Sequence, residues 1–528
     1  MCGIVGQVRI ASTPAGGGQE IDPELGRRMQ ARLVHRGPDD LGEKELPHAW
    51  LGHRRLSIVD VAGGKQPLHT PDEQLFAVGN GEIYNFETVK DGLDGPWLTR
   101  SDNEVALHLV QQRGPDSLSE LEGMFAFLMA GTDGSFLAVR DPVGIKPLFW
   151  ACRDGLVLFA SEMHAFDPEW QDAVELFPPG HYWSPEGGLV RFASAVRTSG
   201  NAAKALEGWS EREIGAVPPP EGVMAEIRDR FVLSVEEQML GDVPVGVFLS
   251  GGLDSSLVAA VAARWCQRHG RTLQTFAVGT EGSSDILAAR AVAEFLGTEH
   301  RERVYTADEA WDALPGVVGS IESFDPALVR SAVANFLLAE FTAAHVKVVL
   351  TGEGADELFA GYAYYDDYRD EGALHEELVR SVEGLHSLNL QRCDRVTMAH
   401  GLEARVPFLD THMIELGLAL PEKAKISGTD EVTGKEKPEK YLLRIAFDGW
   451  VPDDVLWRGK IQFGDGSGAS EVIQERAEAS VTDEEFAELA GEVEPPLRNK
   501  EEAAYYRMFR VALPKVRPEK TISRFATV

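Results

Sequence analysis

A cysteine stands at position 2 of the chain, directly after the initiator methionine. If that methionine is removed, Cys2 keeps a free α-amine beside its thiol. An α-amine titrates near pH ~8 in model compounds, so it can take the proton of the thiol. One residue then supplies both a nucleophile and its base, whereas a retained methionine would block the amine. Cys2 alone is a weak signal, because an incidental cysteine would look the same.

Residues with complementary chemistry follow in the next hundred positions. NGEIYN offers the side-chain amide of Asn80 and the backbone NH of Gly81, which we expect in a tight turn, as donors for an oxyanion hole. SDNE is typical of a helix cap and leaves Asp102 to hold an ammonium group. GHRRLSIVD at 52–60 predicts arginines at a strand edge. Taken singly, each segment fits an ordinary turn, cap or salt-bridged strand equally well.

A second reactive segment, SGGLDSS, occupies residues 250–256 between an apolar strand pattern and an alanine-rich helical pattern. Its glycines let backbone NH groups approach a phosphate, and the start of a helix adds partial positive charge. Asp254 can hold Mg²⁺. The chain has no GxxxxGK[ST], and the missing lysine fits cleavage that releases pyrophosphate. Although GGxDS also occurs in ordinary turns, the strand–loop–helix context favours nucleotide binding.

The elements that position Cys2 belong to a sheet-rich half of the chain. Residues 1 to about 195 contain short apolar runs separated by turns, such as 75–80 and 156–161. Two helical periodicities interrupt this pattern, over 25–33 and 103–112.

The elements that position SGGLDSS follow a different pattern. Residues 195–221 are small, polar and proline-rich, which predicts a linker. Beyond them strands alternate with helices, which predicts a parallel sheet with helices on both faces. After about residue 366 the pattern is mostly helical and loop, and we expect a mobile loop at 464–469 and an acidic surface at 480–495. The expected division is a first domain over 1–207, a linker over 208–221 and a second domain over 222–528.

The composition limits the class of protein. A chain of 528 residues predicts two large domains. The 84 acidic and 51 basic residues give a net charge of -33, which argues against nucleic acid and anionic membrane as partners. We find no long apolar run and no signal peptide, and we expect a reducing cytoplasm. The remaining cysteines form no zinc or disulfide pattern and are expected to be small core residues: Cys152, Cys266 and Cys393.

Seven segments in order, MCGIVG, HRGPDD, GHRRLSIVD, NGEIYN, SDNE, LEGMFAF and RDPVGIKPLF, resemble the class II glutamine amidotransferases. The resemblance covers nearly the whole first domain and implies an N-terminal-nucleophile αββα sandwich. It implies Cys2 as nucleophile and Asn80 with Gly81 as oxyanion hole. Arg55, rather than Arg54, would bind the glutamine carboxylate, because the family arginine directly precedes LSIVD. The implied glutamine-binding residues are Arg55, Ile58, Val59, Asn80, Glu82 and Asp102.

Residues from about 222 to about 470 resemble the synthetase domain of glutamine-hydrolysing asparagine synthetases. The matching segments are VPVGVFLSGGLDSS, FAVG, SSDILAARAVAEFLGTEH, VVLTGEGADELFAGY, GLEARVPFLD and WRGKIQFGDG. The resemblance implies a parallel-sheet α/β pyrophosphate-loop domain, Mg²⁺ on Asp254 and Asp356, Glu353 as base for ammonia attack, and Lys460 beside the leaving pyrophosphate or the acyl-adenylate. There are less specific interpretations of three of these residues: Glu353 and Asp356 could cap a helix, and Lys460 could be a solvated lysine in a loop. The implied ATP-binding residues are Leu249, Ser250, Gly251, Gly252, Leu253, Asp254, Ser255, Ser256, Val278 and Gly352.

The sequence departs from the family in the segment expected to line the acceptor pocket. Arg330 is present and could meet a carboxylate bidentately, together with Glu353. Ala327, however, stands where the family has a threonine. A less polar wall fits a less polar acceptor or a variant aspartate pocket, and we favour aspartate.

The combined prediction is a glutamine-dependent amidotransferase. Glutamine would form a thioester on Cys2, and the released ammonia would pass inside the protein to an acyl-adenylate made from ATP and a carboxylate. Three alternatives are a related enzyme that amidates another carboxylate, a ring-closing enzyme like β-lactam synthetase, and a non-catalytic subunit. Intact Cys2 and SGGLDSS argue against the last two. A homodimer is a candidate assembly.

Overall fold

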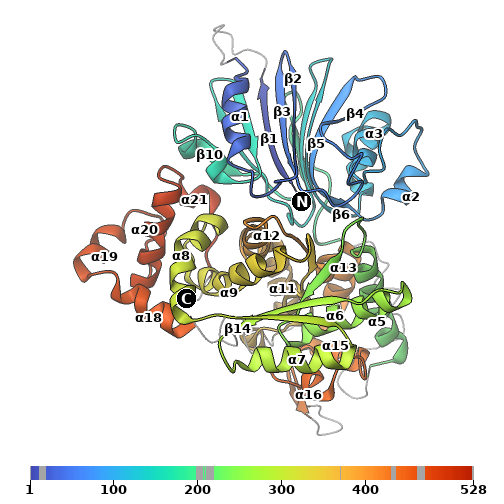
Figure 1. The fold of residues 1–528 in the computed structure, drawn as a ribbon, viewed down its shortest axis with the longest axis vertical. Helices are drawn as coiled ribbons and strands as arrows, with labels where there is room; N and C mark the ends of the chain where they lie inside the picture. The colour runs from blue at the N-terminus through green and yellow to red at the C-terminus, as the bar shows by residue number, and fades with distance from the viewer. Residues whose placement is uncertain are drawn as a thin grey trace.

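A computed structural model of the chain describes residues 2–10, 20–197, 206, 209, 219–368, 370, 372–429, 436–460 and 470–525. The chain forms two stacked parts, with paired antiparallel sheets in one and a parallel sheet surrounded by helices in the other (Figure 1). Most of the predicted linker, and the predicted loop at 464–469, lie outside the described residues.

The first part is a sandwich of two six-stranded sheets, with every neighbouring pair of strands antiparallel among the described residues. Their facing side chains form a dry core that includes Ile4, Leu51, Val78 and Phe159. In spatial order the first sheet contains β10 (Val174–Leu176), β8 (Phe149–Arg153), β9 (Leu156–Ala160), β1 (Gly3–Arg9), β3 (Ala49–Arg55) and β2 (Asp40–Leu46). The second contains β12 (Gly188–Arg191), β11 (His181–Ser184), β7 (Phe136–Arg140), β6 (Gly123–Gly131), β5 (Leu75–Ile83) and β4 (Leu68–His69).

Helices cover the outer faces of this sandwich, which confirms the predicted αββα arrangement. α1 (Pro23–Ala31) packs on β1 and β3, and α3 (Glu104–Arg113) packs on β4 and β5, next to the short α2 (Phe86–Lys90). α1 starts two residues before the predicted 25–33, because the Asp22 carboxylate accepts hydrogen bonds from the NH groups of Glu24 and Leu25.

The second part contains a five-stranded, all-parallel sheet, as the alternating pattern predicts. Its order is β15 (Glu299–Val304), β14 (Gln274–Gly279), β13 (Val245–Phe248), β16 (Val348–Leu350) and β17 (Glu403–Arg405). The helices up to the last strand are α5 (Glu221–Glu237), α6 (Leu253–Arg268), α7 (Ser284–Leu296), α8 (Ala307–Ile321), α9 (Pro326–Ala343), α10 (Ala355–Phe359), α11 (Ala373–Gly384) and α12 (Asn389–Met398). After it come α13 (Thr411–Ala419), α14 (Glu422–Lys425), the small hairpin β18 (Gly428–Thr429) and β19 (Glu436–Lys437), α15 (Tyr441–Ala446) and α16 (Asp453–Leu456).

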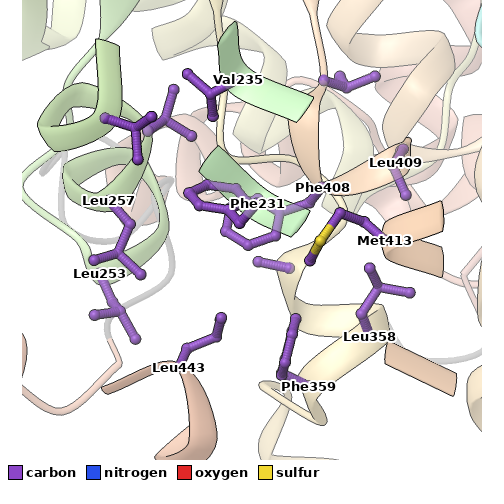
Figure 2. Close-up of a cluster of buried hydrophobic side chains, with 14 of the residues drawn as sticks. Phe231, Val235, Leu253, Leu257, Leu358, Phe359, Phe408, Leu409, Met413 and Leu443 are labelled. Carbon is purple, nitrogen blue, oxygen red and sulfur yellow. The ribbon is translucent and has the colours of Figure 1, made fainter. Parts of the chain in front are cut away.

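A hydrophobic core fixes the helices that carry the polar residues of this part (Figure 2). Leu253 and Leu257 of α6 face Phe231 of α5 and Leu443 of α15, and the ring of Phe231 stacks on Phe408 with centroids 4.3 Å apart. Because α6, α10 and α15 share this core, the polar side chains at their ends are held in fixed relative positions.

The C-terminal helices form a lobe beside α8 and α9 (Figure 1). They are α18 (Ser470–Ala479), α19 (Asp483–Leu489), α20 (Lys500–Ala512) and α21 (Pro518–Thr521). The predicted acidic surface at 480–495 includes α19, which Thr482 caps and in which no residue is buried. Among the described residues no helix is long and apolar enough to span a membrane.

Two of the three cysteines predicted to lie in the core are buried, namely Cys266 and Cys393. The prediction is wrong for Cys152, which is exposed. Cys152 lies near the end of β8, opposite Val157 of β9, at a position where the side chain is left exposed.

Candidate active sites

Cys2 lies immediately before β1, buried at the junction of the two parts of the molecule. Its backbone NH donates a 2.9 Å hydrogen bond to Oδ1 of Asn80, and its carbonyl accepts a 3.0 Å bond from Nε of Arg36. Burial raises the pKa of the thiol. A thiol in this position needs a neighbouring base to become a nucleophile, which is the task predicted for the α-amine of the same residue.

Asn80 and Gly81 lie on β5 and not in the predicted tight turn, where they pair with Ala126 and Phe125 of β6. Gly81 is required there because a Cβ atom would come within 2.0 Å of the Met124 carbonyl oxygen, so the glycine reflects close strand contact. The Nδ2 atom of Asn80 is buried and has no hydrogen-bond partner among the described residues. A buried, unpartnered donor beside a nucleophile suits an oxyanion hole.

Arg55 ends β3, and its guanidinium donates to the carbonyl oxygens of Val59, Asp60 and Val61 at 3.2, 2.8 and 3.2 Å. These contacts fix the side chain without neutralising its charge, so it remains able to bind a carboxylate. Ile58, also predicted at the glutamine site, is buried, and its carbonyl accepts a 2.9 Å bond from Asp242 of the second part. The segment after β3 therefore lies on the boundary between the two parts.

Asp102 is buried beside the end of β5, where its Oδ2 accepts a 2.7 Å bond from the NH of Ile83. Burial raises the pKa of its carboxyl to about 6. SDNE lies at the start of α3 as predicted, with Asn103 at the N-cap position, although the Asn103 side chain makes no capping bond. Glu82 is buried 3.4 Å from Arg405 of β17, and burial raises its pKa well above the ordinary range.

SGGLDSS lies at the junction of β13 and α6, as predicted, but only residues 250–252 form a loop, and Leu253–Ser256 are the first turn of α6. Gly251 has φ +75°, and a Cβ there would lie 2.5 Å from Cβ of Ala288. Gly352 approaches the loop so closely that its own Cβ would lie 2.9 Å from Cβ of Asp254. Predicted neighbours Leu249 and Val278 are buried on the adjacent strand ends. The loop hydroxyls and amides are bonded to one another, with the NH of Ser250 donating to Oγ of Ser255 and the Oγ of Ser256 donating to the Gly252 carbonyl.

The two predicted metal ligands, Asp254 and Asp356, lie on opposite sides of one lysine that the sequence interpretation missed. Nζ of Lys440 is 2.5 Å from Asp254 and 2.7 Å from Asp356, and Lys460 also forms an ion pair with Asp356. Although burial acts to raise the pKa of Asp356, the two ammonium groups lower it to about 2. Burial also acts to lower the pKa of Lys440, but the two carboxylates raise it.

The donor set can still accept a cation. The Oδ1 atom of Asp254 is buried and has no hydrogen-bond partner among the described residues. A buried carboxylate oxygen is the ligand that Mg²⁺ prefers, so the residues fit the predicted ion.

Glu353 and Arg330, the predicted acceptor residues, each form an ion pair within the protein. Glu353 pairs with Arg392 of α12, whose Nη1 also donates to Oγ of Ser331 at 2.9 Å. Arg330 pairs with Glu501 of α20 at 2.7 Å. Glu353, Arg392 and Ser331 therefore meet between α9 and α12, and Arg330, the residue before Ser331 on α9, contacts α20.

Helix α12 connects this region with Cys2. Asp394 pairs with Arg36 at 2.8 Å, and Arg36 bonds to the Cys2 carbonyl. Arg392, two residues earlier in the same helix, pairs with Glu353. The start of the chain and α12 lie together at the junction of the two parts (Figure 1).

Three contributors were missed from the sequence: Lys440, Arg392 and Glu501. Lys440 is the N-cap residue of α15, with φ +56°, but nothing in EKPEKYLLR marks it as a partner of SGGLDSS. Arg392 and Glu501 lie within ordinary helical sequence. Their roles depend on which helices pack together, and local spacing does not encode this.

Comparison with known proteins gives the same two parts. The model of the family described as asparagine synthase matches residues 226–371 and 366–512, and that of the glutamine amidotransferase domain matches residues 1–178. A probable glutamine-hydrolysing asparagine synthetase of Dictyostelium discoideum is 36% identical, over 94% of this chain and 92% of its own. The corresponding protein of Schizosaccharomyces pombe is 37% identical over 96% and 92%, and asparagine synthetase 2 of Arabidopsis thaliana is 36% identical over 99% and 89%. With this similarity along almost its whole length, the chain belongs to the asparagine synthase family.

Proposed function

We propose that this protein transfers the amide nitrogen of glutamine to aspartate and makes asparagine at the expense of ATP. The observation that carries the proposal is the pair of sites joined through α12. At one end Arg36 and Asp394 link the helix to Cys2, and at the other Arg392 links it to Glu353. Similarity to relatives named glutamine-hydrolysing asparagine synthetases supports aspartate over the other acceptors considered.

In the first half-reaction the Cys2 thiolate attacks the side-chain amide carbon of glutamine. Nδ2 of Asn80 and the NH of Gly81 stabilise the oxyanion. The α-amine of Cys2 returns the proton of the thiol to the leaving nitrogen, so that the C–N bond breaks and ammonia leaves as the thioester forms. Arg55 holds the glutamine carboxylate and Asp102 its ammonium group. Water then hydrolyses the thioester and releases glutamate.

In the second half-reaction the side-chain carboxylate of aspartate attacks the α-phosphorus of ATP. Pyrophosphate leaves, and an acyl-adenylate forms, which is a far better electrophile than a carboxylate. Ammonia attacks its carbonyl carbon, Glu353 accepts a proton, and AMP leaves with both electrons of the broken C–O bond. The SGGLDSS backbone and Lys460 bind the phosphates, and Lys440 fixes the two aspartates beside them.

Asp254 and Asp356 would hold Mg²⁺, which when bound would offset the negative charge of the phosphates. The unpartnered Oδ1 of Asp254 supports this assignment. The glutaminase occupies residues 1–207 and the synthetase residues 222–528, joined by the linker 208–221. Four cysteines without a disulfide pattern support a cytoplasmic location.

The test is product analysis by mass spectrometry after incubation with ATP, Mg²⁺, amide-labelled glutamine and L-aspartate. The expected products are labelled asparagine, glutamate, AMP and pyrophosphate. Glutamate without asparagine would refute aspartate as the acceptor while retaining the glutaminase assignment, and a screen of other carboxylates would follow. Absence of both products from folded protein would refute the whole proposal.

A further inference from the structure

The C-terminal lobe contacts the segment that is predicted to line the acceptor pocket. Arg498, just before α20, pairs with Asp325 at 2.9 Å, and the NH of Phe525 donates to the same carboxylate at 3.0 Å. Asp325 in turn caps α9, the helix that carries Arg330. Two stretches of chain more than a hundred residues apart therefore form one unit around the start of α9.

Within this unit Glu501 has a specific relation to Arg330. Its side chain is 0% exposed, against 20% for Arg330, so a ligand can reach the arginine but not the glutamate. Oε2 of Glu501 lies 2.7 Å from Nη1 of Arg330, and Oε1 accepts a 3.0 Å bond from the hydroxyl of Tyr505. Both carboxylate oxygens are thereby fixed.

The contact uses only one edge of the arginine. Among the described residues, no hydrogen bond involves Nε or Nη2 of Arg330. These two donors form the face that binds a carboxylate bidentately, and they stay available while Nη1 is held. A carboxylate at this depth would be costly without its cation, so the pair is a stable feature of the fold.

We propose that Glu501 is a positioning residue for acceptor recognition, which holds the Arg330 guanidinium so that its other edge binds the α-carboxylate of the amino-acid acceptor. The inference rests on the proposed function, because it assumes that the carboxylate acceptor lies against Arg330. It assigns part of the acceptor specificity to the C-terminal lobe. Glu501 itself touches no substrate.

The test measures the KM for aspartate in Glu501→Met, which keeps the volume and removes both hydrogen bonds. A freely rotating Arg330 is expected to raise this KM by ~10-fold, the loss of about one charge-assisted hydrogen bond, while the KM for glutamine in the glutaminase reaction stays unchanged. Glu501→Gln keeps an acceptor oxygen near Nη1 and is expected to recover most of the loss. A KM for aspartate that stays at the wild-type value in folded Glu501→Met would overturn the proposal.

Glu502→Met is the matched control, since Glu502 is equally buried in the same turn but pairs with Arg498 and Arg524. This variant is expected to lower thermal stability without the selective change in the KM for aspartate. An equal rise in that KM would show that any damage to α20 has this effect and would refute a specific role for Glu501.

If Glu501→Met does not fold, Tyr505→Phe removes only the hydroxyl that holds Oε1 and is expected to raise the KM for aspartate by ~2-fold. An unchanged KM in that variant would then count against the proposal. Failure of the proposed function is distinguishable, because wild-type protein would then make no asparagine from aspartate.

Discussion

The glutaminase and synthetase sites differ in how their charges are balanced. In the glutaminase site Arg55 bonds to backbone carbonyl oxygens, and the Nδ2 donor of Asn80 has no partner among the described residues. In the synthetase site each predicted charged residue already has an oppositely charged protein partner. These pairs are Asp254 with Lys440, Asp356 with Lys440 and Lys460, Glu353 with Arg392, and Arg330 with Glu501.

This difference indicates two ways of preparing a binding site. Glutamine can bind to donors that are already fixed and partly unpaired, so the first site needs little rearrangement. Buried charges in the second site are stable only while they are paired. Substrates that bind at the proposed residues would therefore join or replace internal ion pairs.

The largest expected effect is the loss of glutamine-dependent synthesis while ammonium-dependent synthesis is retained. Cys2→Ala removes the nucleophile, so glutamine-dependent asparagine formation should fall by at least ~10³-fold. Synthesis from added ammonium should persist, because none of the charged pairs of the second site involves Cys2. Asparagine formation with glutamine and with ammonium chloride would be measured side by side.

Cys152→Ala is the matched control, since this cysteine is exposed in the same part of the molecule. It should leave both activities intact. If folded Cys2→Ala loses the ammonium-dependent reaction as well, the two sites are not separate and the comparison is wrong.

The next largest effect concerns the balance of charge between Lys440 and the two aspartates of the synthetase site. Lys440→Met leaves Asp254 and Asp356 facing each other without their shared cation, so binding of the negatively charged phosphates becomes less favourable. Pyrophosphate release should fall by ~10²-fold, comparable to the loss of one preorganised electrostatic contact. Hydrolysis of glutamine to glutamate should continue.

Lys423→Met removes an exposed lysine from the same region and should not change pyrophosphate release. Pyrophosphate release at the wild-type rate in Lys440→Met would mean that the bridging ammonium has no part in the reaction. The contrast in charge balance would then have no functional meaning.

The smallest effect concerns pH. Because burial raises the pKa of Asp102 to about 6, this carboxyl is protonated at lower pH and then cannot pair with the ammonium group of glutamine. The kcat/KM for glutamine hydrolysis should therefore fall as the pH drops below about 6, approaching ~10-fold per pH unit. In the synthetase site the pKa of Asp356 is about 2, so that carboxyl stays ionised over the same range.

The measurement is glutamate formation between about pH 5 and pH 7, in wild type and in Asp102→Asn. The asparagine variant should have low kcat/KM throughout and lack the acid limb. An acid limb of equal midpoint in Asp102→Asn would assign the titration to another group.

The local sequence pattern allowed part of each site to be predicted. The order of strand, loop and helix follows from apolar runs interrupted by glycine, and the structure has this order, although the helix begins at Leu253 and includes Asp254. Gly81 was misinterpreted, because glycine is common in turns, whereas here it permits close approach to the Met124 carbonyl across the sheet. A sequence pattern gives the residue type at such a position but not the reason for it.

The other half of each site comes from distant segments. Lys440 lies 186 residues after Asp254, and Glu501 lies 171 residues after Arg330. Such pairs form because the helices that carry them pack on a common core, as α6 and α15 do in Figure 2. A single sequence without an alignment carries no signal for which helices meet, so the partners of the charged residues could not be found.

Helix α12 contacts both sites directly. Asp394 pairs with Arg36, which bonds to the carbonyl of Cys2. Arg392, in the same helix, pairs with Glu353. If acceptor binding shifted α12 and changed the affinity for glutamine by some factor, glutamine binding would change the affinity for the acceptor by the same factor, because binding linkage is reciprocal. A coupling of that kind through one helix would keep ammonia release in step with its consumption.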